Sequence, residues 1–392
     1  MIKSSRIESI DILRGLVMVI MALDHTRDFF HYDGFFRDPT NLETTTPFLF
    51  FTRFITHYCA PVFVFLAGTS AFLYGTKKTK PELFKFLLTR GLWLVILEIV
   101  FNNLIWKFDL SYSRVILQVI WAIGFSMVCL SFLIYLPKKA LLAVGIVIVV
   151  GHNLLDNVVM NGSNATSFIW YLLHQNNMVT INEYLKIGIF YPVLPWIGVM
   201  VLGYCLGNLY KADFDATLRK KYLSLIGFTA IALFFIIRGI NVYGDLVPWS
   251  MQKNATYTIL SFFNLTKYPP SLAYVLITIG PALLFLFAIE KIKNKMTDFL
   301  LVFGRVPLFY YFLHVLLIHT LAIVGILLVG GDWKIMILDA HAFDNQILIG
   351  YGYSLFAVYL IWMFVIFLLY FPSKRYMVYK AANKNKWWLS YL

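Results

Sequence analysis

Charged residues are scarce in this sequence. Asp, Glu, Lys and Arg make up only 14% of the 392 residues, whereas about a quarter is usual in a globular protein. Long uncharged runs fill almost the whole chain, and the mean hydropathy is +0.74. This composition excludes an ordinary soluble domain. It favours one integral membrane domain over residues 1–392, whose core is the helix bundle itself.

Cysteine is also rare, and the usual signatures of soluble enzymes are missing. The three cysteines, Cys59, Cys129 and Cys205, all fall inside apolar runs, which predicts neither a disulfide framework nor a metal site. There is no Walker-type phosphate loop, no dinucleotide glycine fingerprint and no HExxH motif. The net charge of +13 does not indicate a nucleic-acid partner, because basic cytoplasmic loops explain it more simply.

The apolar runs predict an all-α polytopic bundle with about ten transmembrane helices. The predicted spans are 10–30, 48–74, 84–106, 113–136, 139–155, 190–210, 222–241, 270–290, 305–329 and 349–371. With the N-terminus inside, most basic residues fall in cytoplasmic segments, so both termini are predicted to be cytoplasmic. The first apolar run is too long for a cleavable signal and lacks a small-residue cleavage site, which favours a retained span.

Several ionisable residues lie within or at the ends of these spans. They are Asp24, His25, Arg27, Asp28, Arg53, His57, Glu98 and His314. A charge at the bilayer centre costs at least about 2.5–3.5 kcal/mol on insertion scales. Residues of this kind are usually kept for a site or a pathway, so they are the candidates for function.

One face of the first span carries polar residues at both ends. Asp11, Arg14 and His25 follow helical steps of three and four together with two methionines. Arg14 and His25 are then about 16 Å apart along the helix axis. The alternatives are that Asp11 and Arg14 anchor the helix at the headgroups, that His25 is a buried hydrogen-bonding residue, and that the neighbouring acids and arginine form a polar collar.

The second span brings another histidine onto one helical face. Arg53, His57 and Pro61 repeat at steps of four, and a proline opens the backbone ladder beside a polar side chain. The simpler interpretation is a histidine hydrogen-bonded to the freed carbonyl. Cys59 lies on nearly the opposite face, which disfavours a Cys/His nucleophile pair within this helix.

Two further spans contain single polar residues near their centres. Glu98 is an acid near the middle of a span, so it should meet a cation or be protonated. His314 lies one turn beyond a pair of tyrosines, and His319 faces elsewhere. One of these two histidines is expected to be structural.

Five sequence segments together resemble the bacterial branch of the heparan-alpha-glucosaminide N-acetyltransferase family, within the transmembrane acyltransferase superfamily. They are Asp-Ile-Leu-Arg-Gly at 11–15, Asp24-His25, Thr-His-Tyr-Cys-Ala-Pro-Val-Phe-Val-Phe-Leu-Ala-Gly at 56–68, Lys-Tyr-Pro-Pro-Ser at 267–271, and Gly-Arg-Val-Pro-Leu-Phe-Tyr-Tyr-Phe-Leu-His at 304–314. The resemblance implies a multi-span enzyme that takes acetyl from cytoplasmic acetyl-CoA. The acetyl group would go to a sugar on the far side of the membrane.

The opening motif is also similar to that of the membrane O-acyltransferases that decorate bacterial surface glycans. In those enzymes the histidine that matches His25 is catalytic. The animal enzymes of the acetyltransferase family have an asparagine there and place their catalytic histidine in the loop after the first span, where this chain has His31, with His57 soon after. The O-acyltransferases also tend to carry two arginines at the start of the third span, of which only Arg90 is present here. The base is therefore His25 or His57.

Acyl transfer from a thioester needs a base, oxyanion donors and cations for the donor phosphates. We assign His25, His57, Asp24 and Glu98 to catalysis, with one of the two acids holding the tautomer of the histidine. Arg14, Arg90 and Arg305 are assigned to the acetyl-CoA phosphates. Arg27, Arg53, Lys267, Tyr268 and His314 are assigned to the sugar or glycan acceptor. The bilayer is the other partner, and no metal is expected.

A proton-coupled transporter for a sugar or polar solute is the alternative, with His25, His57 and Glu98 as its proton relay. No internal repeat supports it. The sequence leaves open the acceptor, N- against O-acetylation, the acyl length, a ternary complex against an acyl-enzyme, and the oligomeric state, a homodimer included. The predicted location is a bacterial inner membrane.

Overall fold

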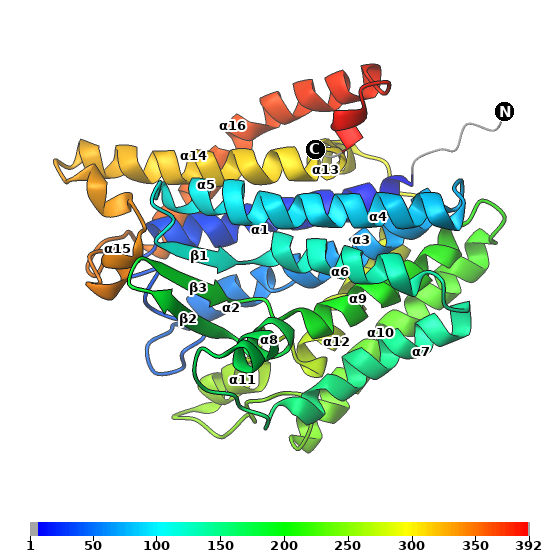
Figure 1. Ribbon diagram of the computed structural model, residues 1–392, viewed down its shortest axis with the longest axis horizontal. Coiled ribbons are helices and arrows are strands. Elements are labelled where there is room, and N and C mark those ends of the chain that lie inside the picture. Colours follow the sequence, from blue (N-terminus) through cyan, green and yellow to red (C-terminus); the bar gives the residue numbers. More distant parts are fainter. Residues whose placement is uncertain (1–6, 391–392) are drawn as a thin grey trace. The chain divides into compact units, whose positions relative to one another are not determined.

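The structure is a computed structural model that describes residues 7–390. α-Helices account for most of these residues, and the strands among them form one small three-stranded sheet (Figure 1). Ten helical segments correspond to the ten predicted spans. The prediction of an all-α polytopic membrane protein is therefore confirmed.

The described residues contain seven segments long and apolar enough to cross a bilayer. They are Pro47–Gly75, Lys138–Leu155, Val193–Tyr210, Ala216–Ile240, Leu272–Ile289, Pro307–Leu328 and Leu355–Ala382. The other three predicted spans are helical but less apolar or shorter. Helix α1 (Glu8–Phe30) carries several charges, α4 (Lys80–Ile96) ends in a π-helical turn, and α6 (Val119–Leu133) has 15 residues.

The chain divides into two compact units. Among the described residues, unit 1 comprises 7–10, Ala60–Ile99 and Val115–Lys291, and unit 2 comprises Asp11–Cys59, Val100–Arg114 and 292–390. Whether they act as one domain, as the composition predicts, stays a prediction. Each unit is described separately below.

Unit 1 is built around paired apolar helices. Its elements are α3 (Cys59–Gly75) from Ala60 on, α4, the first half of η1 (Leu97–Asn102), β1 (Arg114–Leu117) from Val115 on, α6, α7 (Lys138–Gly151), η2 (His152–Leu155), α8 (Ala165–Leu173), β2 (Asn177–Asn182), β3 (Leu185–Ile189), α9 (Val193–Leu206), η3 (Gly207–Tyr210), α10 (Ala216–Ile240), α11 (Ala255–Phe263) and α12 (Leu272–Ile289). Helix α10 packs against α12, α4 against α6, and α9 against both α6 and α7. The sheet has the order β1-β3-β2 and lies in segments where the sequence predicted only a span end and a loop.

Unit 2 holds most of the first span and the C-terminal helices. Its elements are α1 from Asp11 on, α2 (Pro47–Thr56), α5 (Asn103–Lys107), α13 (Lys295–Arg305), α14 (Pro307–Leu328), η4 (Trp333–Met336), α15 (Ala340–Asp344), α16 (Leu355–Ala382) and η5 (Trp387–Ser390). Helix α14 contacts α5, α13, α16 and η4. It is therefore the central packing element of this unit.

The helix starts follow local capping chemistry. Thr79 and Glu82 form a capping box at the start of α4, and Asn294 and Thr297 form a similar one at α13. Ser271 caps α12 by accepting a hydrogen bond from the N–H of Tyr274. Such caps satisfy N–H groups that the first turn of a helix cannot pair internally.

The second predicted span is broken at His57. Helix α2 ends at Thr56, and α3 begins at Cys59. Pro61 has no N–H to donate to the carbonyl of His57, four residues earlier in the chain. The break therefore follows from the sequence, and it exposes backbone polar groups next to a histidine.

Helices α1 and α13 cross at two glycines within unit 2. A Cβ atom added at Gly304 would lie 1.8 Å from the carbonyl oxygen of Asp11, and one added at Gly15 would lie 1.9 Å from that of Leu300. Only glycine permits backbones to approach so closely. The crossing brings the N-terminal turns of α1 next to the C-terminal end of α13.

Candidate active site

Two histidines from distant parts of the sequence form a buried pair in unit 2. His25 lies in α1 and His314 in α14, and the Nδ1 atom of His25 is 2.7 Å from the Nε2 atom of His314. The rings are nearly parallel, with an interplanar angle of 7°. Both side chains are buried. The pair joins a residue assigned to catalysis with one assigned to the acceptor.

The backbone determines which nitrogen of each neutral ring carries its proton. The Nδ1 atom of His314 is 2.9 Å from the carbonyl oxygen of Tyr310. Because a carbonyl only accepts, this Nδ1 carries the proton and the Nε2 atom of His314 has the lone pair. His25 then donates its Nδ1–H to His314. Its own lone pair is consequently on Nε2, the form that a general base requires.

Aromatic rings surround the pair. The ring of Trp106 meets His25 edge to face at 4.7 Å between centroids, and Tyr311 does so at 6.0 Å. The indole N–H of Trp106 donates to the hydroxyl of Tyr311 at 3.2 Å. These contacts hold the imidazoles in one orientation, as a preorganised site needs.

His319, five residues beyond His314, has a structural position. Its two ring nitrogens lie 3.0 Å from the carbonyl oxygen of Ile105 and 2.9 Å from that of Met336. Its ring stacks on Phe108 with 3.9 Å between centroids. His319 thus ties α14 to α5 and η4, which agrees with the expectation that one of the two histidines is structural.

Asp24, which directly precedes His25 in the chain, is the centre of an ion-pair network. Its carboxylate accepts hydrogen bonds from Arg53 at 2.6 Å and from the hydroxyl of Thr56 at 2.8 Å. Arg27 lies 2.9 Å from the same carboxylate and 2.5 Å from Asp28. The two arginines assigned to the acceptor are therefore both engaged with Asp24. The network attaches α2 to α1.

A second cluster of charges lies near the other end of α1. Arg14 contacts Asp11 at 2.9 Å and donates to the carbonyl of Gly304 at 3.3 Å. Arg305 is 3.9 Å from Asp11. The side chain of Asp11 is 4% exposed, against 15% for Arg14 and 29% for Arg305. Two of the three arginines assigned to phosphate binding thus converge on Asp11 with partly exposed side chains, while Arg90 belongs to α4 of unit 1.

His57 occupies the break between α2 and α3. Its side chain is buried, with the ring of Phe54 6.4 Å away between centroids. Its backbone N–H donates to the carbonyls of Arg53 and Phe54. The structure thus places it at a proline-dependent kink, where it stays the second candidate for the base.

Glu98 belongs to unit 1 and meets a helix N-terminus there. It is fully buried in η1, and its carboxylate accepts a hydrogen bond from the backbone N–H of Trp121 at 3.0 Å. This N–H belongs to the first turn of α6. Helix N-termini favour negative charge, so the interaction lowers the cost of burying an acid.

Lys267 and Tyr268 also belong to unit 1. The ammonium group of Lys267 lies 5.1 Å from the centre of the Tyr268 ring and 5.9 Å from that of Tyr191. The Tyr191 and Tyr268 rings meet edge to face at 5.1 Å. A cation beside two aromatic rings is a combination that suits a sugar.

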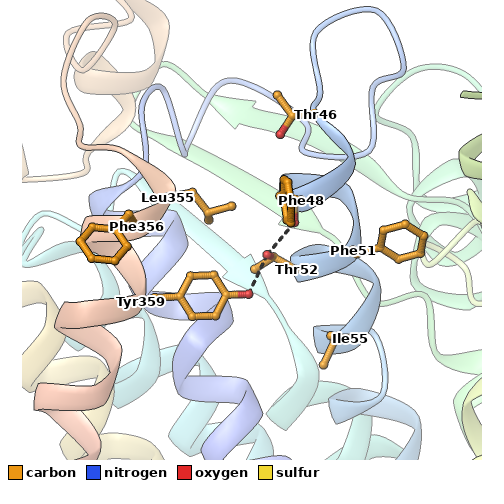
Figure 2. A pocket seen from close by; sticks show the side chains of 8 residues that line it. All are labelled: Thr46, Phe48, Phe51, Thr52, Ile55, Leu355, Phe356 and Tyr359. Carbon is orange, nitrogen blue, oxygen red and sulfur yellow. Dashed lines mark hydrogen bonds between the residues drawn. The ribbon is translucent and has the colours of Figure 1, made fainter. Parts of the chain in front are cut away.

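A groove of about 560 Å³ lies between α2 and α16 in unit 2. Figure 2 shows that aromatic and aliphatic side chains line most of it, with Thr52 hydrogen-bonded to the hydroxyl of Tyr359 at 2.9 Å. Phe48 and Phe356 are highly exposed. The lining contains no acid, base or strong nucleophile, so it matches a lipid-facing surface better than a reaction site.

Sequence reasoning identified both members of the histidine pair but missed their contact. It expected Asp24 or Glu98 to hold the catalytic histidine in one tautomer. In the structure, the partner of the Nδ1 atom of His25 is His314. The two histidines are 289 positions apart. The residue pattern along one helix does not predict which residue of a distant helix it will contact.

Buried imidazoles on α1 and α14, with a cluster of charges where α1 meets α13, form an arrangement that is compatible with group transfer in a membrane. The comparison with protein families agrees. The catalytic-domain model of the heparan-alpha-glucosaminide N-acetyltransferase family matches residues 6–237, more than half of the chain. The chain belongs to this family and is a membrane acetyltransferase. The match gives no support to the transporter alternative, and a search of the curated proteins found no match.

Proposed function

We propose that this protein transfers acetyl from cytoplasmic acetyl-CoA to an amino sugar or glycan on the extracytoplasmic side, with His25 as general base. The observation that carries the proposal is the His25–His314 pair. Its hydrogen bonds leave a lone pair on the Nε2 atom of His25. The family match supports the acetyl-transfer chemistry, and the family's description supports a hexosamine acceptor.

The chemistry follows from this tautomer. The acceptor amine, or a hydroxyl, attacks the thioester carbonyl while His25 Nε2 takes its proton. The C–S bond then breaks, and the CoA thiolate leaves with that proton. General base catalysis of this kind contributes typically about 10²- to 10⁴-fold. Direct transfer in a ternary complex needs no acyl-histidine, so it is the mechanism we favour.

The donor would be held by the cluster near the N-terminal end of α1. Arg14 and Arg305 share Asp11 and keep part of their surface accessible, which suits the phosphates of acetyl-CoA. Arg14 and His25 are on one helix, about 16 Å apart along its axis. This separation fits an extended pantetheine arm. Arg90, in α4 of unit 1, stays a phosphate ligand predicted from the sequence alone.

The acceptor would be held by polar residues that the structure ties into local networks. Asp24 orients Arg27 and Arg53, so these arginines are preorganised for a hydroxyl or carboxylate of a glycan. In unit 1, Lys267 and Tyr268 stay predicted acceptor residues from the sequence, a cation beside an aromatic ring. His57 is the alternative base.

The positive-inside rule supports cytoplasmic termini and an active face directed outward. The basic residues Lys77, Lys78 and Lys80 follow the second span, and Lys291 and Lys293 follow α12. We accordingly propose the cytoplasmic membrane of a bacterium as its location. The acetyl group alone would cross the bilayer.

The test is acetyl transfer from acetyl-CoA to glucosamine by detergent-purified protein, with thermal unfolding in CoA measured alongside. His25→Ala and His25→Gln should lose about 10²- to 10⁴-fold in kcat but keep the CoA-dependent rise in Tm. His341→Ala is the matched control, because His341 is exposed in α15 of the same unit.

Three results would overturn parts of the proposal. Full activity in both His25 variants with loss in His57→Ala would transfer the role of base to His57. Absence of both a CoA-dependent Tm shift and acetyl transfer would refute the donor. Transfer to hydroxyls but not to amines would make the enzyme an O-acetyltransferase.

A further inference from the structure

Two histidines and an aspartate of unit 1 converge at the end of α7, and none of the three has a role in the proposed function. His152 opens η2, Asp156 follows η2, and His174 caps the C-terminus of α8. One potential ligand atom from each lies within 4.8 Å of the others. The Nε2 atom of His174 is 3.7 Å from Oδ1 of Asp156.

Burial makes this cluster unlike a solvated surface group. His152 and His174 are each 3% exposed, and the side chain of Asp156 is 10% exposed. Neither ring nitrogen of His152 has a partner that meets full hydrogen-bond geometry among the described residues, although the backbone of Pro270 lies within reach of the ring. Buried polar groups are normally paired, so this imidazole points to a ligand.

The surrounding residues orient the three side chains. Asn153 donates to Oδ2 of Asp156 at 2.8 Å and accepts the backbone N–H of Leu272 at 2.9 Å. The indole of Trp170 stacks on His174 with an interplanar angle of 11°. Supporting contacts of this kind around ligand side chains are a regular property of metal sites.

We propose that His152, Asp156 and His174 bind a divalent transition-metal ion, with Zn²⁺ the best fit. Imidazole and carboxylate donors suit Zn²⁺, whose bonds to them are about 2.0–2.2 Å long. Tetrahedral geometry then puts donor atoms roughly 3.4 Å apart. The 3.7 Å between His174 and Asp156 is close to this value, and small side-chain rotations bring in His152.

Coordination changes one hydrogen bond. The Nε2 atom of His174 now faces the carbonyl oxygen of His152 at 2.7 Å. Binding the metal through Nε2 places the His174 proton on Nδ1, and water or that carbonyl completes the coordination. The ion would tie η2 to the end of α8 and so brace the loop that contains β2 and β3.

The sequence pattern alone gives little warning of this site. His152 and Asp156 are four residues apart, as two ligands on one helical turn can be. The third ligand comes from a separate helix, and no cysteine takes part. A search for cysteine spacing or for the HExxH motif therefore cannot find this site.

The test uses the full-length protein purified without a polyhistidine tag. After treatment with EDTA and addition of ZnCl₂, the wild type should retain about one Zn²⁺ per chain by mass spectrometry and show a raised Tm. His174→Ala and the near-isosteric Asp156→Asn should weaken Zn²⁺ binding by at least about 10- to 100-fold, the typical effect of losing even an outer partner. His341→Ala should bind Zn²⁺ like the wild type.

Co²⁺ provides a readout that does not depend on the variants being stable. The wild type loaded with Co²⁺ should show the visible absorption of a tetrahedral site, which supports the proposal even if a variant fails to fold. Sub-stoichiometric Zn²⁺ in the wild type would overturn it, as would equal Zn²⁺ in the wild type and His174→Ala. None of these measurements requires acetyl transfer, so they are independent of the proposed function.

Discussion

Replacing Gly304 by alanine perturbs the crossing of α1 and α13 in a way whose cost follows from the structure. The new Cβ atom would lie 1.8 Å from the carbonyl oxygen of Asp11 and 2.9 Å from the backbone nitrogen of Gly15. Because non-bonded atoms rest at about 3.5 Å, the helices would have to separate by roughly 1.7 Å. Both obstructing atoms are backbone, so no rotamer change relieves the clash. We expect a loss of at least about 3 kcal/mol, the upper end of typical overpacking costs.

The assay is thermal unfolding in one detergent, followed by tryptophan fluorescence. Gly239→Ala is the matched control, since a Cβ at Gly239 in α10 meets nothing within 4 Å. Alanine is the better helix former by up to about 1 kcal/mol, so this control should unfold at or above the wild-type temperature. A Gly304→Ala protein as stable as Gly239→Ala would refute the close crossing.

The same variant has a second consequence for the donor cluster. Arg14 donates to the carbonyl of Gly304 at 3.3 Å, and Arg305 follows Gly304 directly in the chain. Separating the helices moves the two arginines apart. The CoA-dependent rise in Tm should therefore shrink in Gly304→Ala and persist in Gly239→Ala. An undiminished rise in Gly304→Ala would show that this cluster does not hold the donor.

Three other substitutions test single interactions. Asp24→Asn leaves Arg53 without its buried counter-charge. It should lower the free energy of unfolding, measured by denaturant titration, by about 3–5 kcal/mol. An unchanged free energy of unfolding would contradict the ion-pair network. Glu98→Gln keeps an acceptor for the Trp121 N–H, so it should cost less than Glu98→Leu, which strands that group at about 1–3 kcal/mol; equal Tm values would refute the capping role. Burial lowers the pKa of His31. The neutral ring therefore carries no stability penalty above about pH 6.5, and stability is lost progressively as the pH falls from the unfolded pKa through the lower folded pKa. The Tm of His31→Gln should then fall less than that of the wild type between about pH 7 and pH 5. Parallel curves of Tm against pH for the two proteins would show that His31 does not cause this loss of stability.

The spans were predictable because lipid imposes one requirement on every residue it contacts. Runs without charge must be helical when no water satisfies the backbone, and Val193–Leu206 and Leu272–Ile289 follow this rule directly. The start of the predicted span 113–136 does not follow it. The residues Arg114–Leu117 form a strand that joins β3, since a short apolar run next to a loop is compatible with either structure.

The candidate site was predictable in its parts and not in its pairings. His25 and Asp24 stood out because ionisable residues are costly in a membrane. Their partners depend on how α1 meets α14 and α2, and no local pattern encodes that. The sequence also could not distinguish His314 from His319. The difference lies in their neighbours, because His319 faces two carbonyls and His314 faces one carbonyl and His25.

Helix α1 gives the proposed mechanism its most specific prediction, because it carries both Arg14 of the donor cluster and the proposed base His25. If Arg14 contacts the phosphates of the nucleotide, a donor without them gains nothing from that side chain. Wild type should then prefer acetyl-CoA over S-acetyl-pantetheine in kcat/KM, and Arg14→Gln should reduce this preference by about tenfold or more, as expected for one charge-assisted hydrogen bond. If Arg14→Gln lowers kcat/KM equally for both donors, Arg14 acts only through its contact with Asp11 and the stability of the fold. Kinetics with the two donors on the two proteins therefore separate recognition of the phosphates from support of the helix crossing.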